Sequence, residues 1–322
     1  MILKIVAIII ALSIQLNVVA GELFVNKKGD GDICSYNDPC RSIQTAIDKA
    51  VDGDIIVIAR GKYHENLFIQ TPGITLQGKN KRRTIITTAG GREGALGNAG
   101  NPLDAIIEVR ASNVAIRNLT IGHPVGVAIK REAAIFAWKG SPNLHVVNSI
   151  IARKRTARTD EPTVPGSRGI FIFAGPGSVI EDNMFIGNYQ DHVHLPSNEV
   201  IVRNNRIAGA SRSGVSVMDP VSFVGPDVFN NKNNVIENNF IRDSLSGGIH
   251  IQGDETTINN NVIVNSDGYG IYLCGEGIGG ACFFPGEEAV SEGNLIGENI
   301  FKHNTLGEVG DFGVDNIFLY DK

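Results

Sequence analysis

Cysteine and aromatic residues are scarce in this chain of 322 residues. Aromatic side chains make up 7% of the sequence, with one tryptophan, and there are 4 cysteines. No two cysteines have the Cys-x-x-Cys spacing that is typical of zinc sites and redox motifs. They fall instead into two local pairs, Cys34 with Cys40 and Cys274 with Cys282. We expect two disulfides that close short loops, as in exported proteins, with free buried thiols as the alternative.

Long apolar runs are absent after the first twenty residues. Lys4 is followed by the run IVAIIIALSI and then by a stretch that ends in the small residue Ala20. A charged start, a short apolar run and a small residue at the end are typical of a secretory signal peptide. We therefore predict a signal peptide over residues 1–20 and a mature β-domain over residues 21–322, without a membrane span. The alternative is an uncleaved anchor. Export predicts a secreted, periplasmic or cell-surface protein.

Nucleotide-binding motifs are also missing. No Gly-Lys-Ser/Thr loop occurs, and the glycine-rich segment GREGALGNAGN (91–101) has no strand–helix–strand context. The formal net charge is −5, yet basic residues outnumber acidic ones between residues 122 and 158. This asymmetry indicates a negatively charged partner. Because nucleic-acid motifs are absent and export is expected, an acidic polysaccharide is favoured over nucleic acid.

The segments that are present are short and bounded by glycine, asparagine or aspartate. Apolar residues at positions 43, 46, 47 and 50 have helical spacing, so we predict a helix near residues 42–51, with Ser42 as its N-cap. Strands are expected in IIVIA (55–59), NLFIQ (66–70), ITLQG (74–78), TIITT (84–88) and IIEVR (106–110).

An asparagine followed two residues later by an apolar residue recurs along the chain. The members are Asn148, Asn183, Asn205, Asn239, Asn261 and Asn299, with Asn118 as a weaker first member. The shortest interval between members is 22 residues. A repeat of this length made of short strands predicts a parallel solenoid, because one coil cannot bury its apolar side alone. We interpret the asparagines as a ladder whose side chains bond to the backbone of the next coil.

Two features resemble a known superfamily. The segment AIDKAVDGDIIVIARGKY (46–63) resembles the opening of right-handed parallel β-helix proteins of the pectin-lyase-like type. The coils with GGIHI and GYGIYL are similar to the repeats of mannuronan epimerase-like and NosD-like proteins. The resemblance implies an all-β fold, a single-stranded right-handed parallel β-helix of about ten coils with a short N-terminal capping α-helix. Lyases, hydrolases, epimerases and adhesins share this fold, so it does not name a reaction.

One strand of each coil carries the candidate site. The strands read AIFAWK, GIFIFA, HVHLPS, GVSVMD, GIHIQG and GIYLCG. Because side chains alternate between the two faces of a strand, outward residues of stacked coils form columns. The first column is predicted to hold Phe136, Phe171, His194, Ser216, His250 and Tyr272. The second is predicted to hold Trp138, Phe173, Pro196, Met218, Gln252 and Cys274. We expect His192 on the same outer face and Lys139 beside it.

This face suits an acidic, uronate-containing polysaccharide. Phe136, Trp138, Phe171 and Phe173 would form a shelf for sugar rings, unless inserted loops cover them. Removal of the proton α to a uronate carboxyl group requires a base and a cation that neutralises the carboxylate. His194 or His250 is the candidate base, and Tyr272 is the candidate acid. Arg168 and Arg212 are the candidate carboxylate clamps. Asp219, Asp254 and Glu276 follow three successive strands and could bind Ca²⁺.

The preferred interpretation is a polysaccharide lyase that acts by β-elimination. Mannuronan epimerases carry Asp-Pro-His on this kind of strand, whereas this chain has His194 and Pro196 at the corresponding positions. The β-helix hydrolases of polygalacturonate use an Asp-Asp pair, and no such pair occurs here. A uronan C5-epimerase and a glycoside hydrolase are therefore further alternatives. The alternative from another class is a non-catalytic glycan-binding or surface protein.

Overall fold

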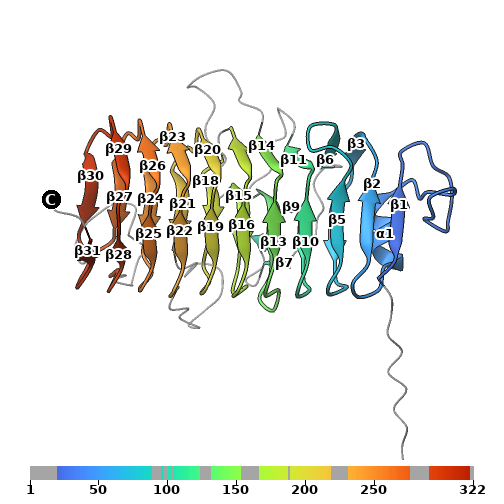
Figure 1. Ribbon diagram of the computed structural model, residues 1–322, viewed down its shortest axis with the longest axis horizontal. Helices are drawn as coiled ribbons and strands as arrows, with labels where there is room; N and C mark the ends of the chain where they lie inside the picture. Colours follow the sequence, from blue (N-terminus) through green and yellow to red (C-terminus); the bar gives the residue numbers. More distant parts are fainter. Residues whose placement is uncertain are drawn as a thin grey trace, which may run out of the picture.

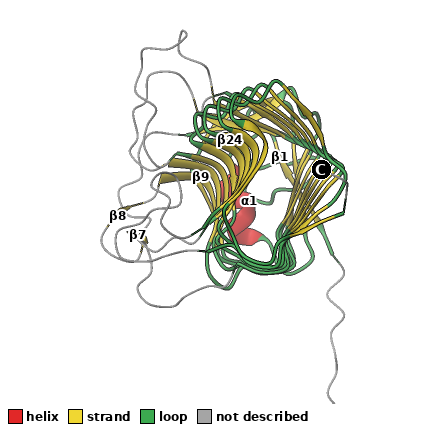
Figure 2. Cartoon of the chain, turned by 90° about the vertical axis from the view of Figure 1, so that its left-hand side faces the viewer, coloured by secondary structure: helices red, strands yellow, loops and turns green. Residues whose placement is uncertain are grey.

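Short parallel strands stack along one axis from the N-terminal to the C-terminal end of the molecule (Figure 1). The computed structural model describes residues 20–88, 96–97, 101–102, 104–123, 132–153, 167–187, 189–218, 231–275 and 290–319. Within these ranges the strands form three parallel sheets of 11, 9 and 9 strands and one antiparallel pair. Viewed along the axis, the three sheets form the walls of one coil (Figure 2). The predicted all-β parallel β-helix is confirmed.

Each complete coil contributes one strand to each sheet, and β1 and β31 at the two ends belong to the first sheet alone. The first sheet contains β1 (Glu22–Val25), β2 (Ile55–Ile58), β5 (Thr75–Gly78), β10 (Ala115–Arg117), β13 (His145–Val147), β16 (Val179–Glu181), β19 (Ile201–Arg203), β22 (Val235–Glu237), β25 (Thr257–Asn259), β28 (Leu295–Ile296) and β31 (Ile317–Phe318). The second contains β3 (Gly61–His64), β6 (Thr84–Thr87), β11 (Thr120–His123), β14 (Ile150–Arg153), β17 (Met184–Ile186), β20 (Arg206–Ala208), β23 (Phe240–Arg242), β26 (Val262–Val264) and β29 (Ile300–Lys302). The third contains β4 (Leu67–Ile69), β9 (Asp104–Val109), β12 (Glu132–Ala137), β15 (Arg168–Ile172), β18 (Asp191–His194), β21 (Ser213–Val217), β24 (Gly247–Ile251), β27 (Tyr269–Leu273) and β30 (Gly307–Asp311). The antiparallel pair is β7 (Leu96–Gly97) with β8 (Asn101–Pro102).

The core runs through the middle of the coils. In the third sheet, Ile170 pairs with Val193, Val193 with Val215, and Val215 with Ile249. All four side chains are fully buried and belong to one cluster that extends from Val25 to Ile296. Burial of one such side chain stabilises a fold by about 1.5–3 kcal/mol. Stacking identical β-branched residues therefore holds each coil to the next.

The asparagine ladder lies at the turn between the first and second sheets. Asn239 accepts hydrogen bonds from the backbone N–H and the side-chain amide of Asn205, both at 3.0 Å. Its own amide donates to the Val202 carbonyl at 2.9 Å and to Asn261 Oδ1 at 3.0 Å. The predicted ladder is thus present at Asn183, Asn205, Asn239, Asn261 and Asn299. Its direction differs from the prediction, because each side chain bonds to the backbone of the preceding coil and not of the next one.

The first members of the ladder were predicted in the wrong register. Ser149, and not Asn148, donates its backbone N–H to Asn183 Oδ1. Asn148 and Asn118 instead have φ values of 47° and 60°, a left-handed conformation that asparagine tolerates. Each lies one residue before the ladder position. Asn148 precedes Ser149, and Asn118 precedes Leu119, whose N–H lies 3.5 Å from the Ser149 hydroxyl.

The ladder gives the first stability prediction. Asn239→Leu removes the acceptor of the buried Asn205 N–H and of one hydrogen of the Asn205 side-chain amide, at about 1–3 kcal/mol each. We expect this variant to lose about 3–5 kcal/mol of unfolding free energy in urea titrations. The control is Asn238→Gly, because Asn238 is exposed with a φ of 56° and Gly accepts that conformation. The control should stay within about 0.5 kcal/mol of the wild type. Equal losses in the two variants would contradict the ladder.

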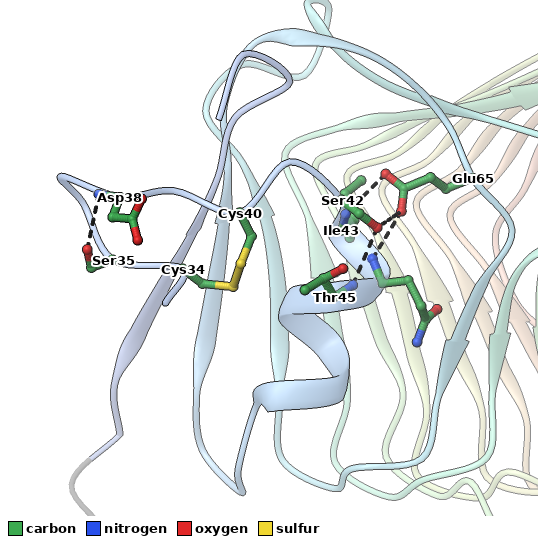
Figure 3. The surroundings of a disulfide bond; sticks show 9 residues. Cys34, Ser35, Asp38, Cys40, Ser42, Ile43, Thr45 and Glu65 are labelled. Atoms are coloured by element: carbon green, nitrogen blue, oxygen red, sulfur yellow. Dashed lines mark hydrogen bonds between the residues drawn. A yellow bond between two sulfur atoms is a disulfide. The ribbon is translucent and has the colours of Figure 1, made fainter. Parts of the chain in front are cut away.

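A helix and a disulfide close the N-terminal end (Figure 3). Helix α1 (Ile43–Lys49) begins after Ser42, whose side chain accepts from the Thr45 N–H, so the predicted N-cap is confirmed. Glu65 adds a second cap, because its carboxylate accepts from the N–H groups of Ile43 and Gln44, both at 3.0 Å. The buried face of α1 packs on the core of the first coil.

The predicted Cys34–Cys40 disulfide is confirmed, with both cysteines buried. No free cysteine occurs in the described part of the chain. Cys274 is buried, and its predicted partner Cys282 lies outside the described residues. Residues 1–19, the bulk of the predicted signal peptide, also lie outside them. None of the helices found in the described ranges has the length and apolarity needed to cross a membrane.

The C-terminal end of the first sheet is formed by Ile317 and Phe318. They form β31, which pairs in parallel with β28 and extends this sheet. Ile317 and Leu319 are 54% and 63% exposed. Up to Leu319, the last residue described, the chain therefore adds a strand to the edge of the sheet.

Candidate functional site

The outer face of the third sheet carries the predicted column. Phe136 pairs with Phe171, Phe171 with His194, His194 with Ser216, Ser216 with His250, and His250 with Tyr272. The pairing confirms the first column in its predicted order. The column also extends toward the N-terminal end through Glu108 and Phe68, which the sequence analysis did not include.

Most of the predicted shelf is buried. Phe136, Phe171 and Phe173 are 4%, 4% and 3% exposed, and they form a cluster separate from the main core. Trp138 packs against this cluster and is partly exposed, at a ring-centroid distance of 4.9 Å from Phe136. Lys139 follows it and is exposed. The rings of the shelf therefore pack against one another. Trp138 is the ring of the shelf that a ligand can reach, because it is partly exposed.

The placement of His192 on the outer face was wrong. Its ring lies 5.7 Å from both the Phe185 and Tyr189 rings, inside the coil, and its Nε2 is 3.1 Å from the Ala208 carbonyl oxygen. Neighbouring strands have Gly169 and Gly214 at this position, where a Cβ would meet atoms of the next coil or of the core. Glycine avoids these close contacts on the neighbouring strands, whereas β18 has an imidazole at this position.

The cause is a break in the alternation of the third sheet. In β12, Ala134 and Ile135 both belong to the main core, whereas Ala133 and Phe136 belong to the outer cluster. Two successive residues thus face inward on each strand. The residue before them then faces outward, which in β18 is Asp191.

Asp191 is the centre of a charged cluster that the sequence analysis did not identify as a site. It is fully buried, and the Arg212 guanidinium holds it with two hydrogen bonds, from Nε to Oδ1 at 2.8 Å and from Nη2 to Oδ2. Arg168 Nε lies 3.1 Å from Oδ2, an ion-pair distance without hydrogen-bond alignment. The predicted clamps Arg168 and Arg212 are therefore both engaged by Asp191.

The charges of this cluster do not cancel. Two guanidinium groups face one carboxylate, so one positive charge remains. Burial alone would raise the pKa of Asp191, but Arg212 and Arg168 hold that pKa below its usual range. Burial lowers the pKa of Arg168 to about 10, which still leaves it charged at neutral pH. Arg212 Nη1 and Arg168 Nη2 have no hydrogen-bond partner among the described residues.

His194 lies against this cluster. Its Nδ1 is 2.6 Å from Ser216 Oγ and 3.6 Å from Asp191 Oδ2. Serine and aspartate thus approach the same ring nitrogen, which excludes a Ser-His-Asp relay, because that relay needs them on opposite nitrogens. Burial, followed by Arg168, holds the pKa of His194 well below 6.5. The ring is neutral, and its Nε2 has no partner among the described residues.

His250 and Tyr272 form a separate pair. Their ring centroids are 5.1 Å apart, and His250 Nε2 is 3.1 Å from Cys274 Sγ. Burial lowers the pKa of His250 to about 3. Tyr272 is three strands from His194, or about 14 Å at the strand spacing of about 4.8 Å. Tyr272 can therefore act as the acid with His250 and not with His194.

The calcium prediction rests on residues that are only partly described. Asp254 accepts from the Glu292 N–H at 3.1 Å and lies 3.7 Å from Lys232 Nζ. Asp219 and Glu276 lie outside the described residues. In the ranges that are described, no three His, Cys, Asp or Glu side chains converge. Calcium binding stays a prediction.

The buried histidines predict acid sensitivity. Burial lowers the pKa of His192 to about 4 and that of His250 to about 3, from 6.5. Between these values the unfolded chain binds protons that the folded chain does not, so stability falls as pH falls below 6.5. Each such histidine should contribute a loss of about 1.4 kcal/mol per pH unit.

Urea titrations at pH 7, 6 and 5 measure this slope. His192→Gln should make the dependence shallower by about one proton, whereas His145→Gln should not, because His145 is exposed. A wild-type stability that is constant from pH 7 to 5 would contradict neutral buried imidazoles.

Comparison with known proteins identifies the fold. The family model described as "Right handed beta helix region" matches residues 68–278, which is well over half of the chain. The uncharacterized protein YwoF of Bacillus subtilis (strain 168) is 25% identical over 277 residues, which cover 76% of this chain and 56% of YwoF. The chain thus spans little more than half the length of that relative.

Solved structures with the same fold include two pectin methylesterases and XylC in complex with xylose. The pectin methylesterase from carrot has 17% identity and a TM-score of 0.56, covering 92% of this chain and 88% of that chain. Pectin methylesterase PemA from Erwinia chrysanthemi has 14% identity and a TM-score of 0.55, covering 92% of both chains. XylC in complex with xylose has 12% identity and a TM-score of 0.60, covering 87% of this chain and 66% of that chain. At sequence identities this low, the similarity shows only that the proteins share a fold.

Proposed function

The chain belongs to the right-handed beta helix family, and from that premise we propose that it is an exported polysaccharide lyase that cleaves an acidic, uronate-containing polysaccharide by β-elimination. One observation carries the proposal: His194 lies beside two arginines whose charge Asp191 only half neutralises. The pectin methylesterases among the similar structures have, by their names, a uronate polysaccharide as substrate, which supports this choice.

The arginines can neutralise the uronate carboxylate, which is the first requirement of β-elimination. The N–H groups of Arg212 Nη1 and Arg168 Nη2, which have no partner among the described residues, would bind the carboxylate of one uronate unit. Neutralising this carboxylate stabilises the negative charge that develops when the α proton leaves. Asp191 pairs with both guanidinium groups, fixes their positions and stays ionised.

His194 can act as the base that removes the α proton, which is the second requirement of β-elimination. Asp191 Oδ2 near Nδ1 favours the tautomer with the proton on Nδ1, which leaves a lone pair on Nε2. The α proton would move to Nε2, a carbon–carbon double bond would form, and the glycosidic C–O bond would break. The imidazolium would then protonate the departing oxygen. Burial and, after it, the charges of Arg168 and Arg212 lower the pKa of His194. A bound carboxylate would offset the charges of the two arginines and so raise this pKa.

The structure makes a two-carboxylate glycosidase a poorer fit. The outward carboxylate of Glu108 lies three strands from that of Asp191, or about 14 Å along the axis. Glycosidases place their two carboxyl groups about 5–9.5 Å apart. Both carboxylates are also buried and paired with arginine.

A non-catalytic glycan-binding protein is the second candidate. The observation that favours it is burial, because His194 and His250 are 5% and 2% exposed. Such a protein would use Trp138 and the arginines without a proton transfer.

One panel experiment separates these candidates. The mature protein is incubated with alginate, polygalacturonate, hyaluronan and chondroitin, with and without Ca²⁺. A rise in ultraviolet absorbance from an unsaturated product supports the lyase. Reducing ends without that absorbance indicate a hydrolase, a changed uronate composition an epimerase, and binding without any product the non-catalytic protein. Each of these three results would overturn the lyase.

A further inference from the structure

A second charged group lies on the outer face of the third sheet, toward the N-terminal end. It consists of Glu108 in β9, Arg110 just after β9, Trp138 just after β12 and Phe68 in β4. Glu108 pairs with Phe68 on one side and Phe136 on the other. The backbone N–H of Trp138 bonds to the carbonyl of Val109, so Trp138 and Arg110 are neighbours on adjacent strands.

The Arg110 guanidinium lies between two aromatic rings. Its guanidinium carbon lies 5.3 Å from the Phe68 ring centroid and 5.0 Å from that of Trp138. Its Nε lies 2.6 Å from Glu108 Oε1, and the Trp138 Nε1–H donates to the same oxygen at 2.8 Å. One buried carboxylate thus fixes both the cation and the indole.

The side of Arg110 that faces away from Glu108 is available. The Arg110 side chain is 40% exposed, whereas that of Glu108 is 7% exposed. Its two terminal nitrogens have no hydrogen-bond partner among the described residues. A guanidinium whose orientation is already fixed loses little freedom when it binds a carboxylate with two parallel N–H groups. The exposed part of Trp138 next to it offers an apolar surface to a sugar ring.

This arrangement and the Asp191 cluster lie on the same face of the third sheet. Strands β9, β12, β15 and β18 are successive neighbours, so three strand spacings, or about 14 Å along the axis, separate Arg110 from Asp191. Because the register partner of Asp191 in β9 is Ala105, Arg110 is also displaced from Asp191 along the strand direction. Ring contacts connect the two sites, from Trp138 to Phe136 at 4.9 Å, to Phe171 at 5.0 Å and to His194 at 4.9 Å. An extended glycan lying obliquely across the face, over this row of rings, would meet a carboxylate-binding arginine at each end.

We propose that Arg110, Trp138 and Glu108 form a distal uronate-binding subsite, in which Arg110 binds a carboxylate of the glycan and Trp138 packs on its ring. The inference rests on the proposed function for the nature of the glycan. Glu108 is a positioning residue, because it touches Arg110 and Trp138 and not the sugar. The subsite selects acidic over neutral units and fixes the polymer on the face several sugar units from the bond that breaks.

Trp138 makes the subsite directly observable. It is the only tryptophan of the chain, so intrinsic tryptophan fluorescence reports on this subsite alone. The experiment uses the His194→Gln variant, in which turnover is suppressed, titrated with short oligomers of galacturonate, mannuronate and hyaluronan. Each oligomer is matched by its carboxyl-reduced form. We expect a saturable fluorescence change with one acidic oligomer and at least tenfold weaker binding of its reduced form.

Arg110 variants test the assignment. In the same background, Arg110→Gln should weaken binding of the acidic oligomer about ten- to hundredfold and leave that of the reduced oligomer unchanged. Arg110→Lys, which keeps the charge but loses the planar fork, should fall between the two. Arg117→Gln is the matched control, because Arg117 is an exposed arginine whose Nε donates to Gln77 at 2.8 Å on the first sheet. It should not change binding.

The outcomes separate this proposal from the proposed function. Equal binding of acidic and reduced oligomers, unchanged binding in both Arg110 variants, or no fluorescence change with any oligomer overturns the subsite, even where the wild type forms product. Arg110-dependent binding together with a wild type that forms no product supports the subsite and removes the lyase.

Discussion

His194→Gln is expected to lower kcat on the uronate substrate by about 10²- to 10⁴-fold, the usual contribution of a positioned general base. Glutamine is similar in size and keeps a polar contact with Ser216, but it cannot accept the α proton. The unfolding free energy should change far less than kcat, because the ring lies on the outer face and not in the core of the coil. Steady-state rates by ultraviolet absorbance and urea titrations of the same samples measure the two effects.

Two other histidine variants serve as controls for this result. His145→Gln alters an exposed residue of the first sheet and should keep full activity. His192→Gln alters the imidazole inside the coil, so it should change stability and leave the activity of the folded protein within about threefold. A His194→Gln enzyme that retains wild-type kcat would remove His194 from the reaction.

Asp191→Ala is expected to cost about 3–5 kcal/mol of unfolding free energy, the largest effect on stability that we predict for a charged residue. The change leaves Arg168 and Arg212 facing each other with side chains only 11% and 17% exposed. Their repulsion and lost hydration have no compensating partner. Guanidinium chloride titrations at neutral pH measure the loss.

The first sheet provides a matched ion pair. Arg203 and Glu181 also bridge adjacent strands, at 2.7 Å, but their side chains are 41% and 24% exposed. Water screens such a pair, so Glu181→Ala should cost less than about 1 kcal/mol. If both variants lost the same free energy, the Asp191 cluster would be an ordinary surface ion pair.

The repeat made the fold predictable from the sequence. Coils of about 22 residues place the same residue type at the same position, so the order of the first column followed from alignment alone. The Asn ladder was predictable for the same reason. Its first members were misplaced because Asn118 and Asn148 occupy left-handed turn positions one residue earlier.

The candidate site was less predictable, because it depends on a local departure from alternation. Strict alternation places His192 and His194 on one face, whereas two successive inward residues turn His192 into the coil and Asp191 outward. The sequence contains a signal for this, since Gly169, Gly214, Gly248 and Gly270 recur at the His192 position. Their missing side chains permit the inward turn. The pairing of Asp191 with two arginines required the register of three coils and could not be derived from spacing.

Proton NMR of the polymer during the reaction in D₂O tests the central claim most directly, because it follows the fate of the α proton. The account predicts that the α-proton signal of the cleaved units disappears as a vinyl proton signal of an unsaturated chain end appears, and that His194→Gln abolishes both changes. New reducing ends without a vinyl signal, or deuterium at the α carbon of an intact chain, would contradict β-elimination at His194.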